Sequence, residues 1–392
     1  MDKEHLHFDP KTLDLLWVPK HGEPVALNDG YSLSVSSDSI FRVNRFRLEI
    51  SLICDLQCDY CIVFMNNINK KIKLMSKDTA DKIVDEFNRT VGEQGDMVII
   101  GGEPLLNWEV VKHVIERCEG RTMLFTNALK LTSDKQRFLK QHHTRILTSL
   151  DGYNEHHNRY RFHHPERKEF ETTCRNIREA ADEGCDLGIA CLVTDLNVTD
   201  LNGIADFFLD ELHCRSYSLA YSHYLLNPTQ VGGFSFENYI EAICKLFDYS
   251  KQRRFYIDQM GRILHGLLLK QNCLVGCKAG SSQRTFYPDG TETICTKLDL
   301  IGVTDKDQIK GIFPMNNAHC KECIAYHLCG GGCLWDALQG SGIRQPDDKL
   351  CVSKKAFVEY LLHDMASELK GACDGNQVHA IIHEKYDDLI IG

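Results

Sequence analysis

The sequence contains no run of about 18 apolar residues, so no segment of it is predicted to span a membrane. Its first stretch, MDKEHLHFDPKTLDLLW, mixes acidic and basic side chains and lacks the apolar core of a secretory signal. An excess of positive charge is also missing, because 45 lysines and arginines face 55 aspartates and glutamates, giving a formal charge of −10. We therefore expect a cytoplasmic protein with no membrane partner and no nucleic-acid partner, since nucleic acids are bound by basic surfaces.

Cysteine, in contrast, is abundant, with 18 residues in a chain of 392. In a reducing compartment such cysteines indicate metal ligands, catalytic thiols or buried small side chains, not disulfides. Most of them lie in two fields, residues 54–61 and residues 273–351. The remaining composition, 43% hydrophobic and 26% charged, is ordinary for a globular protein, and the length indicates more than one domain.

Short apolar runs of strand length alternate with helical patterns from residue 45 onward. The runs that predict strands are residues 45–52, 97–102, 122–127, 145–150, 187–194 and 216–221. The first intervening helix is predicted over 77–90, with Ser76 as its N-cap. Strands that alternate with helices predict right-handed crossovers and a mainly parallel sheet. Six such units are too few for a closed eight-fold barrel, so the predicted fold class is α/β, a partial (β/α)6 barrel.

The composition divides the chain into consecutive segments. After residue 273 cysteine and glycine dominate, and such a segment buries little core and depends on bound metal for its fold. Apolar pieces at DLLWVP and YSLSVS predict a strand or two near the amino terminus. The predicted segments are an N-terminal extension (1–44), the partial barrel (45–252), a linker helix (253–272), a metal-stabilised domain (273–352), and a C-terminal helix and tail (353–392).

The first cysteine field reads CDLQCDYC and begins two residues after the first predicted strand. Active sites on parallel sheets lie at the carboxyl ends of the strands, which is where this loop stands. Thiolates are soft ligands that suit iron–sulfur clusters. Cys54, Cys58 and Cys61 are one ligand short of a four-iron cluster, so one iron would stay open for another molecule.

This loop resembles the CxxxCxΦC signature of the radical S-adenosylmethionine (radical SAM) superfamily, in which Φ is aromatic and is Tyr60 here. The partial barrel is also that superfamily's fold. The resemblance implies that the amino and carboxylate groups of S-adenosylmethionine chelate the open iron. Reductive cleavage of this cofactor then yields methionine and a 5′-deoxyadenosyl radical that abstracts hydrogen. Tyr60 would pack near the adenine.

Two further motifs fall where the superfamily places them. GGEP ends the second predicted strand, and the resemblance implies that Gly101 and Gly102 allow close backbone approach while Glu103 accepts from the methionyl ammonium. TNA ends the third predicted strand and contributes Thr126 and Asn127 to the same cofactor site.

The stretch SLDGYNEHHNRYR follows the fourth predicted strand and resembles the family's S-x-D-G…H-x-x-x-R motif. The resemblance implies that Ser149 binds the ribose hydroxyls and that Arg161 binds the methionyl carboxylate. His157 is expected to support structure, and Asp151 with Gly152 is equally well explained as a turn.

The second cysteine field resembles the SPASM domain, with the spacing CX12GX4C, then CX2CX5CX3C, then a last cysteine. The family pattern implies two interleaved sets of four ligands, one auxiliary cluster on Cys273, Cys277, Cys295 and Cys333 and another on Cys320, Cys323, Cys329 and Cys351. With the first field this makes three [4Fe–4S] clusters. Zinc is the alternative metal for these cysteines, and without Cys273 the first auxiliary cluster would keep an open iron for substrate.

SPASM-bearing relatives mostly modify peptides or proteins, so the resemblance implies a radical SAM oxidoreductase that matures a ribosomally made precursor peptide. An intrapeptide C–C cross-link is favoured by elimination. Formylglycine-forming relatives carry an aspartate base where Thr296 follows Cys295, and only about 44 residues precede the first barrel strand, too few for the full peptide-recognition module. An electron donor such as flavodoxin or ferredoxin is also expected.

Other functions stay open at this point. Within the same class the alternatives are a thioether-forming or epimerising peptide maturase and a sulfatase-type formylglycine maturase. From other classes they are a radical enzyme that acts on RNA or a small metabolite, and a zinc-stabilised binding protein without catalysis. Two auxiliary clusters favour a peptide substrate, and the net negative charge argues against an RNA substrate.

Overall fold

The computed structural model describes residues 4–33, 40–63, 71–221, 234–340 and 348–390. The chain divides into two compact units, each built from separated stretches. The barrel unit is Phe41–Phe234 with Lys278–Lys306, and the helical unit is Met1–Ile40, Ser235–Cys277 and Asp307–Gly392. Five consecutive segments were expected from the sequence, and that division stays a prediction.

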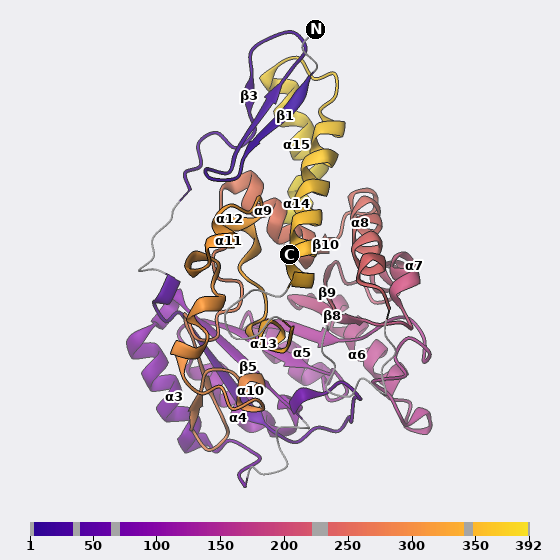
Figure 1. Cartoon of the computed structure of the whole chain (residues 1–392). Coiled ribbons are helices and arrows are strands. Elements are labelled where there is room, and N and C mark those ends of the chain that lie inside the picture. The colour runs from indigo at the N-terminus through magenta and orange to yellow at the C-terminus, as the bar shows by residue number, and fades with distance from the viewer. Residues whose placement is uncertain (1–3, 34–39, 64–70, 222–233, 341–347, 391–392) are drawn as a thin grey trace. The chain divides into compact units, whose positions relative to one another are not determined.

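A parallel sheet forms the centre of the barrel unit, as predicted (Figure 1). Its strands run in sequence order, each hydrogen-bonded to the next. The strands are β4 (Arg45–Ser51), β5 (Asp96–Gly101), β6 (Arg121–Thr126), β7 (Arg145–Ser149), β8 (Leu187–Val193) and β9 (Ser216–Tyr221). A hairpin of β11 (Gln283–Phe286) and β12 (Glu292–Thr293) adds to this sheet, because β11 pairs in parallel with β4.

Apolar residues alternate along β4, and its last four residues are buried on both faces. Phe46, Leu48 and Ile50 are fully buried on one face, each burial contributing about 1.5–3 kcal/mol. Phe46 meets Phe87 of α3 (Lys77–Thr90) with ring centroids 5.3 Å apart, so this face packs on a helix. The predicted cap of α3 is confirmed, since the Ser76 hydroxyl accepts from the Thr79 N–H at 3.1 Å.

Four further helices and several short turns complete the barrel unit. The helices are α4 (Trp108–Arg117), α5 (Ser133–Gln141), α6 (Glu169–Glu183) and α7 (Leu201–Asp206). The helical stretch that begins with α7 is only partly α-helical, because α7 passes into the π-helical turn η5 (Phe207–Glu211). The short elements are η1 (Gly92–Gln94), η2 (Pro104–Asn107), η3 (Pro165–Arg167), η4 (Val198–Asp200) and α10 (Thr296–Asp299).

The helical unit begins with a small antiparallel sheet of β1 (His5–Asp9), β2 (Asp14–Val18) and β3 (Val25–Ala26). DLLWVP is therefore a strand as expected, whereas YSLSVS lies partly outside the described residues. The Trp17 indole N–H donates to the Ala372 carbonyl at 3.0 Å. Asn28 donates to the carbonyl of Leu267 at 2.7 Å, so this sheet is tied to helices that are distant in sequence.

Long helices form the rest of this unit: α8 (Phe236–Arg253), α9 (Asp258–Leu269), α14 (Asp348–Glu368) and α15 (Gly375–Ile390). The predicted linker helix (253–272) corresponds to α9, but Tyr256–Ile257 within that range form the short strand β10 instead. The C-terminal helix expected from residue 353 onward corresponds to α14, on which Phe357, Leu361 and Met365 are buried. Lys251 of α8 pairs with Glu368 at 3.1 Å, which fastens α8 to α14.

The described residues 306–340, which carry half of the cysteines of the second field, form short helices. They are η6 (Lys306–Gln308), which runs in from the barrel unit, η7 (Lys310–Ile312), η8 (Pro314–Asn316), α11 (Ala318–Lys321), α12 (Tyr326–Cys329) and α13 (Leu334–Gly340). The expectation that this segment buries little core is wrong, because Phe313, Leu328 and Trp335 are among its many buried apolar side chains. Within the described part of the chain, no helix is both long enough and apolar enough to cross a membrane.

Candidate active site

The cysteine loop leaves the carboxyl end of β4 and is held by the neighbouring GGEP loop. The Gly102 N–H donates to the Ser51 carbonyl at 2.5 Å, and the Glu103 N–H donates to the Ile53 carbonyl at 2.8 Å. A Cβ atom on Gly102 would lie 2.4 Å from the Ile53 oxygen. A Cβ on Gly101, whose φ is +150°, would lie 2.1 Å from the Ser51 oxygen. Both glycines are therefore needed for the two loops to meet.

The three cysteines of this loop are half-buried. The Cys61 N–H donates to the Cys58 carbonyl at 3.0 Å, which closes a turn between them. Burial raises the pKa of both the Cys54 and the Cys58 thiol to about 12. Buried, closely spaced thiols on one loop fit a metal cluster, because a bound metal deprotonates the thiols that ligate it.

Glu103 joins the GGEP loop to the TNA loop. Its carboxylate is fully buried and accepts from the Leu105 N–H at 2.9 Å, the Thr126 hydroxyl at 2.8 Å and the Asn127 N–H at 2.8 Å. Burial raises the pKa of Glu103 to about 7, although these hydrogen bonds oppose the shift. A carboxylate accepts about four hydrogen bonds, so one position stays available for the expected ammonium contact.

Asn127 links Glu103 to the cysteine loop. Its side-chain amide donates to Asp55 at 2.7 Å and lies 3.7 Å from the Cys54 sulfur. Asp55 Oδ2 is buried, and no described residue forms a hydrogen bond with it. The sequence interpretation missed Asp55, although its place directly after the first cysteine of the motif was a signal. The predicted residues Glu103, Asn127 and Cys54 thus belong to one connected cluster.

Asp151 is a second residue that sequence reasoning did not assign to the site. Its carboxylate accepts from the Tyr60 hydroxyl at 2.5 Å, from Arg161 at 3.3 and 3.4 Å, and from the Leu192 N–H at 2.9 Å. Asp151 and Arg161 are both buried, with side chains 2% and 8% exposed. Asp151 therefore does more than form a turn, since it holds two residues expected at the cofactor site.

Arg161 lies between Tyr60 and the cysteine loop. Its guanidinium carbon is 5.5 Å from the centroid of the Tyr60 ring, and one of its nitrogens is 4.0 Å from the Cys58 sulfur. Burial is the largest cause that raises the pKa of Tyr60 well above its usual range, so this phenol stays protonated and donates to Asp151. Ser149 ends β7 two residues before Asp151, at the same edge of the sheet.

The second cysteine field is divided between the units. Cys295 belongs to the barrel unit, at the start of α10, while the other seven belong to the helical unit. Two backbone hydrogen bonds fix the loop around Cys273. The Cys273 N–H donates to the His327 carbonyl at 2.6 Å, and the Gly276 N–H donates to the Gly330 carbonyl at 2.7 Å. The predicted interleaving of the first set of four ligands stays a prediction.

The second predicted set of four, Cys320, Cys323, Cys329 and Cys351, lines a single small cavity. Lys354 and Lys355 line it as well, so two cations face the four thiols. This donor set fits a four-thiolate metal cluster, whose negative charge the lysines would offset. Across the described residues, however, no group of three or more histidine, cysteine or acidic side chains is arranged to hold a metal ion, so the ligand sets expected for all three clusters stay predictions.

Residues 48–208 match the family described as the Radical SAM superfamily. This stretch runs from β4 to α7 and contains the cysteine loop, GGEP, TNA and Asp151. The chain therefore contains a radical SAM domain. The binding of S-adenosylmethionine and iron–sulfur chemistry follow from this assignment, and the prediction made from CDLQCDYC is confirmed at that level.

Curated relatives of this radical SAM enzyme include two with different activities. The radical SAM cyclopropyl synthase TigE of Paramaledivibacter caminithermalis is 20% identical over 332 residues, 75% of this chain and 68% of TigE. The cysteine-type anaerobic sulfatase-maturating enzyme of Clostridium novyi is 24% identical over 356 residues, 78% of this chain and 91% of the relative.

Solved structures confirm the α/β fold class. Native anSMEcpe with bound AdoMet superimposes with a TM-score of 0.64 at 20% identity and covers 83% of this chain and 100% of that one. Streptococcus suis SuiB bound to S-adenosylmethionine superimposes with a TM-score of 0.58 at 16% identity and covers 79% and 77%. At these identities the likeness concerns the fold alone.

Proposed function

We propose that this radical SAM enzyme takes a hydrogen atom from a ribosomally made peptide and thereby closes an intrapeptide C–C cross-link. Support for a peptide substrate comes from solved relatives, because anSMEcpe has been determined with the Kp18Cys peptide and SuiB with precursor peptide SuiA. Support for bond closure at carbon comes from TigE, whose name describes a cyclopropyl synthase.

The observation on which the proposal mainly rests is the connected cluster at the ends of β4 to β7. Cys54, Cys58 and Cys61 would hold a [4Fe–4S] cluster, which with S-adenosylmethionine supplies a hydrogen-abstracting radical. Near these cysteines lie two polar side chains, Glu103 and Arg161, whose orientation is fixed by their hydrogen-bond and ion-pair partners. Glu103 offers one remaining acceptor position, and Arg161 is kept charged and fixed by its buried pair with Asp151.

The surroundings of Cys295 bear on the choice between cross-linking and formylglycine formation. Thr296, which follows Cys295, is buried and has no acidic group. The first carboxylate that follows Thr296 in the sequence, Asp299, accepts from the hydroxyls of Tyr287 and Thr293, each at 2.6 Å. An acid held by two donors is a poor base, which argues against the formylglycine reaction as it is expected in relatives.

Formylglycine formation is nevertheless the second candidate, because several curated relatives are sulfatase-maturating enzymes. Mass spectrometry separates the products. The enzyme, reduced anaerobically by flavodoxin or ferredoxin, would be mixed with the peptide encoded by a small reading frame next to its gene. We expect the peptide to lose two hydrogens and to remain unreactive toward a hydrazide that labels aldehydes.

Other outcomes identify the alternatives. A hydrazide-reactive product would establish the formylglycine reaction, and an unchanged mass with uptake of solvent deuterium would establish epimerisation. Loss of two hydrogens together with loss of a titratable cysteine thiol would indicate a thioether. A colourless protein that contains zinc and no iron after anaerobic purification would refute the proposal altogether, since we expect about twelve irons from three four-iron clusters.

A further inference from the structure

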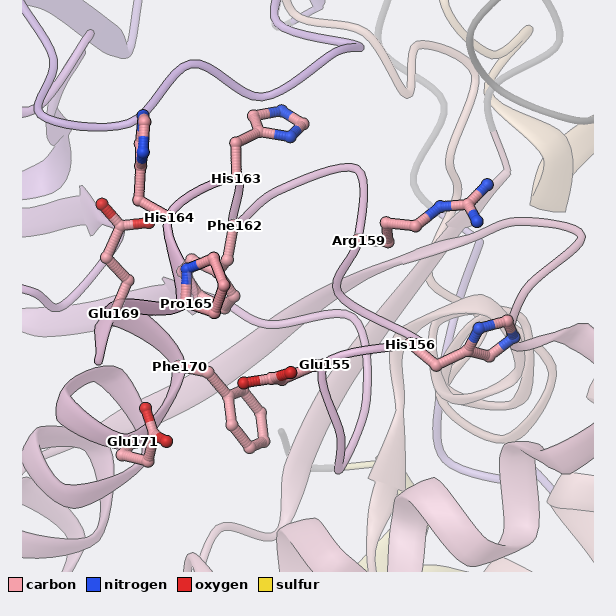
Figure 2. A pocket seen from close by; sticks show the side chains of 10 residues that line it. All are labelled: Glu155, His156, Arg159, Phe162, His163, His164, Pro165, Glu169, Phe170 and Glu171. Atoms are coloured by element: carbon pink, nitrogen blue, oxygen red, sulfur yellow. The ribbon is translucent and has the colours of Figure 1, made fainter. Parts of the chain in front are cut away.

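A cavity of about 390 Å³ lies in the barrel unit between the loop that follows Asp151 and the start of α6 (Figure 2). All its lining residues come from the segment 155–171. This segment is joined to the cysteine loop, because the Asp59 N–H donates to the Tyr160 carbonyl at 2.9 Å and His163 lies 3.4 Å from the Asp59 carboxylate. The cavity is therefore next to the candidate active site.

Glu169 is the unusual residue of this cavity. It is the first residue of α6 and is only 5% exposed, yet its Oε2 forms no hydrogen bond with any described residue. The nearest cation, Arg167, is 3.8 Å from Oε1, which is too long for a hydrogen bond. A buried carboxylate oxygen without a donor is unfavourable, so a bound N–H donor would stabilise it.

The rest of the lining also suits a cation. Glu155 and Glu171 add two carboxylates, and in Figure 2 the Arg159 guanidinium points away from all three acids. The rings of Phe162 and Phe170 have centroids 6.2 Å apart and offer apolar faces. Aromatic faces next to carboxylates bind the alkyl stem and the charged end of a lysine or an arginine together.

We propose that this cavity binds a cationic side chain, arginine or lysine, of the peptide substrate, with Glu169 as its main partner. The inference rests on the proposed function, because it assumes that the substrate is a peptide. Binding here would place a neighbouring residue of the peptide near the cysteine loop and would make a basic residue part of the recognition sequence.

A direct binding measurement tests the site without cluster chemistry. Isothermal titration calorimetry would use the full chain with N-acetyl-arginine methylamide, and the neutral isostere N-acetyl-citrulline methylamide as the control probe. We expect the citrulline compound to bind about tenfold more weakly, and N-acetyl-lysine methylamide to bind like the arginine compound. Glu169→Gln should weaken the arginine probe about tenfold, which corresponds to about 1.4 kcal/mol.

Glu183→Gln, at the other end of α6 and outside the cavity, is the matched control and should bind as tightly as the unmodified chain. If Glu169→Gln does not fold, the exposed residues Glu155 and Glu171 replace it, and each change to Gln should weaken binding about threefold. Equal binding of the arginine and citrulline probes, or undiminished binding in these variants, would overturn the site.

The two proposals fail in different ways. If Glu169→Gln binds and modifies the peptide as well as the unmodified chain does, the cation site is wrong and the proposed function stands. If the arginine probe binds through Glu169 but no peptide is modified, the cavity binds cations and the proposed function is wrong.

Discussion

The Tyr60 hydroxyl donates a 2.5 Å hydrogen bond to the Asp151 carboxylate, and this contact joins the cysteine motif to a loop 91 residues further along the chain. The same carboxylate pairs with Arg161, whose side chain reaches back toward Cys58. The buried Asp151 carboxylate therefore holds Tyr60 of the cysteine motif and Arg161 of its own motif in one arrangement. That arrangement leads to the first of four predictions.

Asp151→Asn should impair cofactor binding and stability together. It removes the charge opposite buried Arg161, and breaking such a pair costs about 3–5 kcal/mol because the remaining charge stays buried. We expect a lower free energy of unfolding and an affinity for S-adenosylmethionine at least tenfold weaker, measured by calorimetry. Asp195→Asn, which removes the charge of the carboxylate that accepts from the Tyr160 hydroxyl, is the control. Unchanged affinity in Asp151→Asn would show that Asp151 does not position the site.

The first cysteine motif makes a second prediction. Cys58→Ala should abolish formation of 5′-deoxyadenosine while about eight of about twelve irons remain, because the auxiliary cysteines are intact. Iron analysis and chromatography of the cleavage product measure both quantities. Cys174→Ala, on α6 and outside both cysteine fields, should keep full iron and full cleavage. Cleavage at the normal rate in Cys58→Ala would contradict the assignment of the open-iron cluster.

Glu103 predicts a pH dependence of stability. Its pKa is about 7 in the folded protein, above its ordinary value of 4.5, because burial disfavours the charged form. Between these values the folded state binds more protons than the unfolded state, so stability falls as pH rises and levels off above pH 7. The full effect is about 3 kcal/mol, taken as an order of magnitude.

Glu103→Gln should remove this slope between pH 4.5 and pH 7, in addition to a constant loss of stability. The constant loss is expected because the Gln amide nitrogen cannot accept from the Asn127 N–H. Denaturant titrations of both proteins at several pH values measure the difference. Parallel curves for the two proteins would mean that Glu103 keeps an ordinary pKa.

The fourth prediction concerns stability and Asp96, which lies at the edge of the sheet opposite the candidate active site. It stands at the start of β5, where Arg45, Arg121 and Lys278 lie 2.8, 2.7 and 3.6 Å from its carboxylate. Burial alone would raise its pKa, but the hydrogen bond from Arg45 and the three positive charges outweigh it and lower the pKa. The resulting stability is present above pH 3.8 and is lost as the pH falls through the lower folded pKa.

Asp96→Asn should therefore lower the free energy of unfolding at pH 7 by about 1–3 kcal/mol. Asp134→Asn is the matched control, because Asp134 pairs with Arg137 at the surface and such pairs contribute about 0–1 kcal/mol. Equal losses in the two variants, measured by chemical denaturation, would contradict a special role for the buried charge.

Several features of the fold were predictable from local patterns. The six strand-length runs became β4 to β9 in a parallel sheet, because alternating apolar residues and short turn segments determine strands locally. Ser76 caps α3 as expected from its type and position. α15 was missed, although Val378, Ile382, Tyr386 and Leu389 have helical spacing and are all buried.

Other features depend on contacts between distant segments. Residues 207–211 have a helical pattern, yet they form a π-helical turn. Asp151 looks like a turn residue in SLDG, and only the approach of Tyr60 and Arg161 makes it the centre of the site. Glu169 is one of many glutamates in the sequence, and burial alone distinguishes it.

The spacing of cysteines and glycines was enough to predict the superfamily, because metal ligation and close backbone approach require particular residues at particular intervals. The alternation of strand-length runs with helical patterns predicted the type of sheet and the position of the cysteine loop at its edge. The tertiary structure decided which charges are buried, which acids share donors and which cavity has an unpartnered carboxylate. Those properties arise from desolvation and from pairing between residues far apart in the chain, and no local pattern records them.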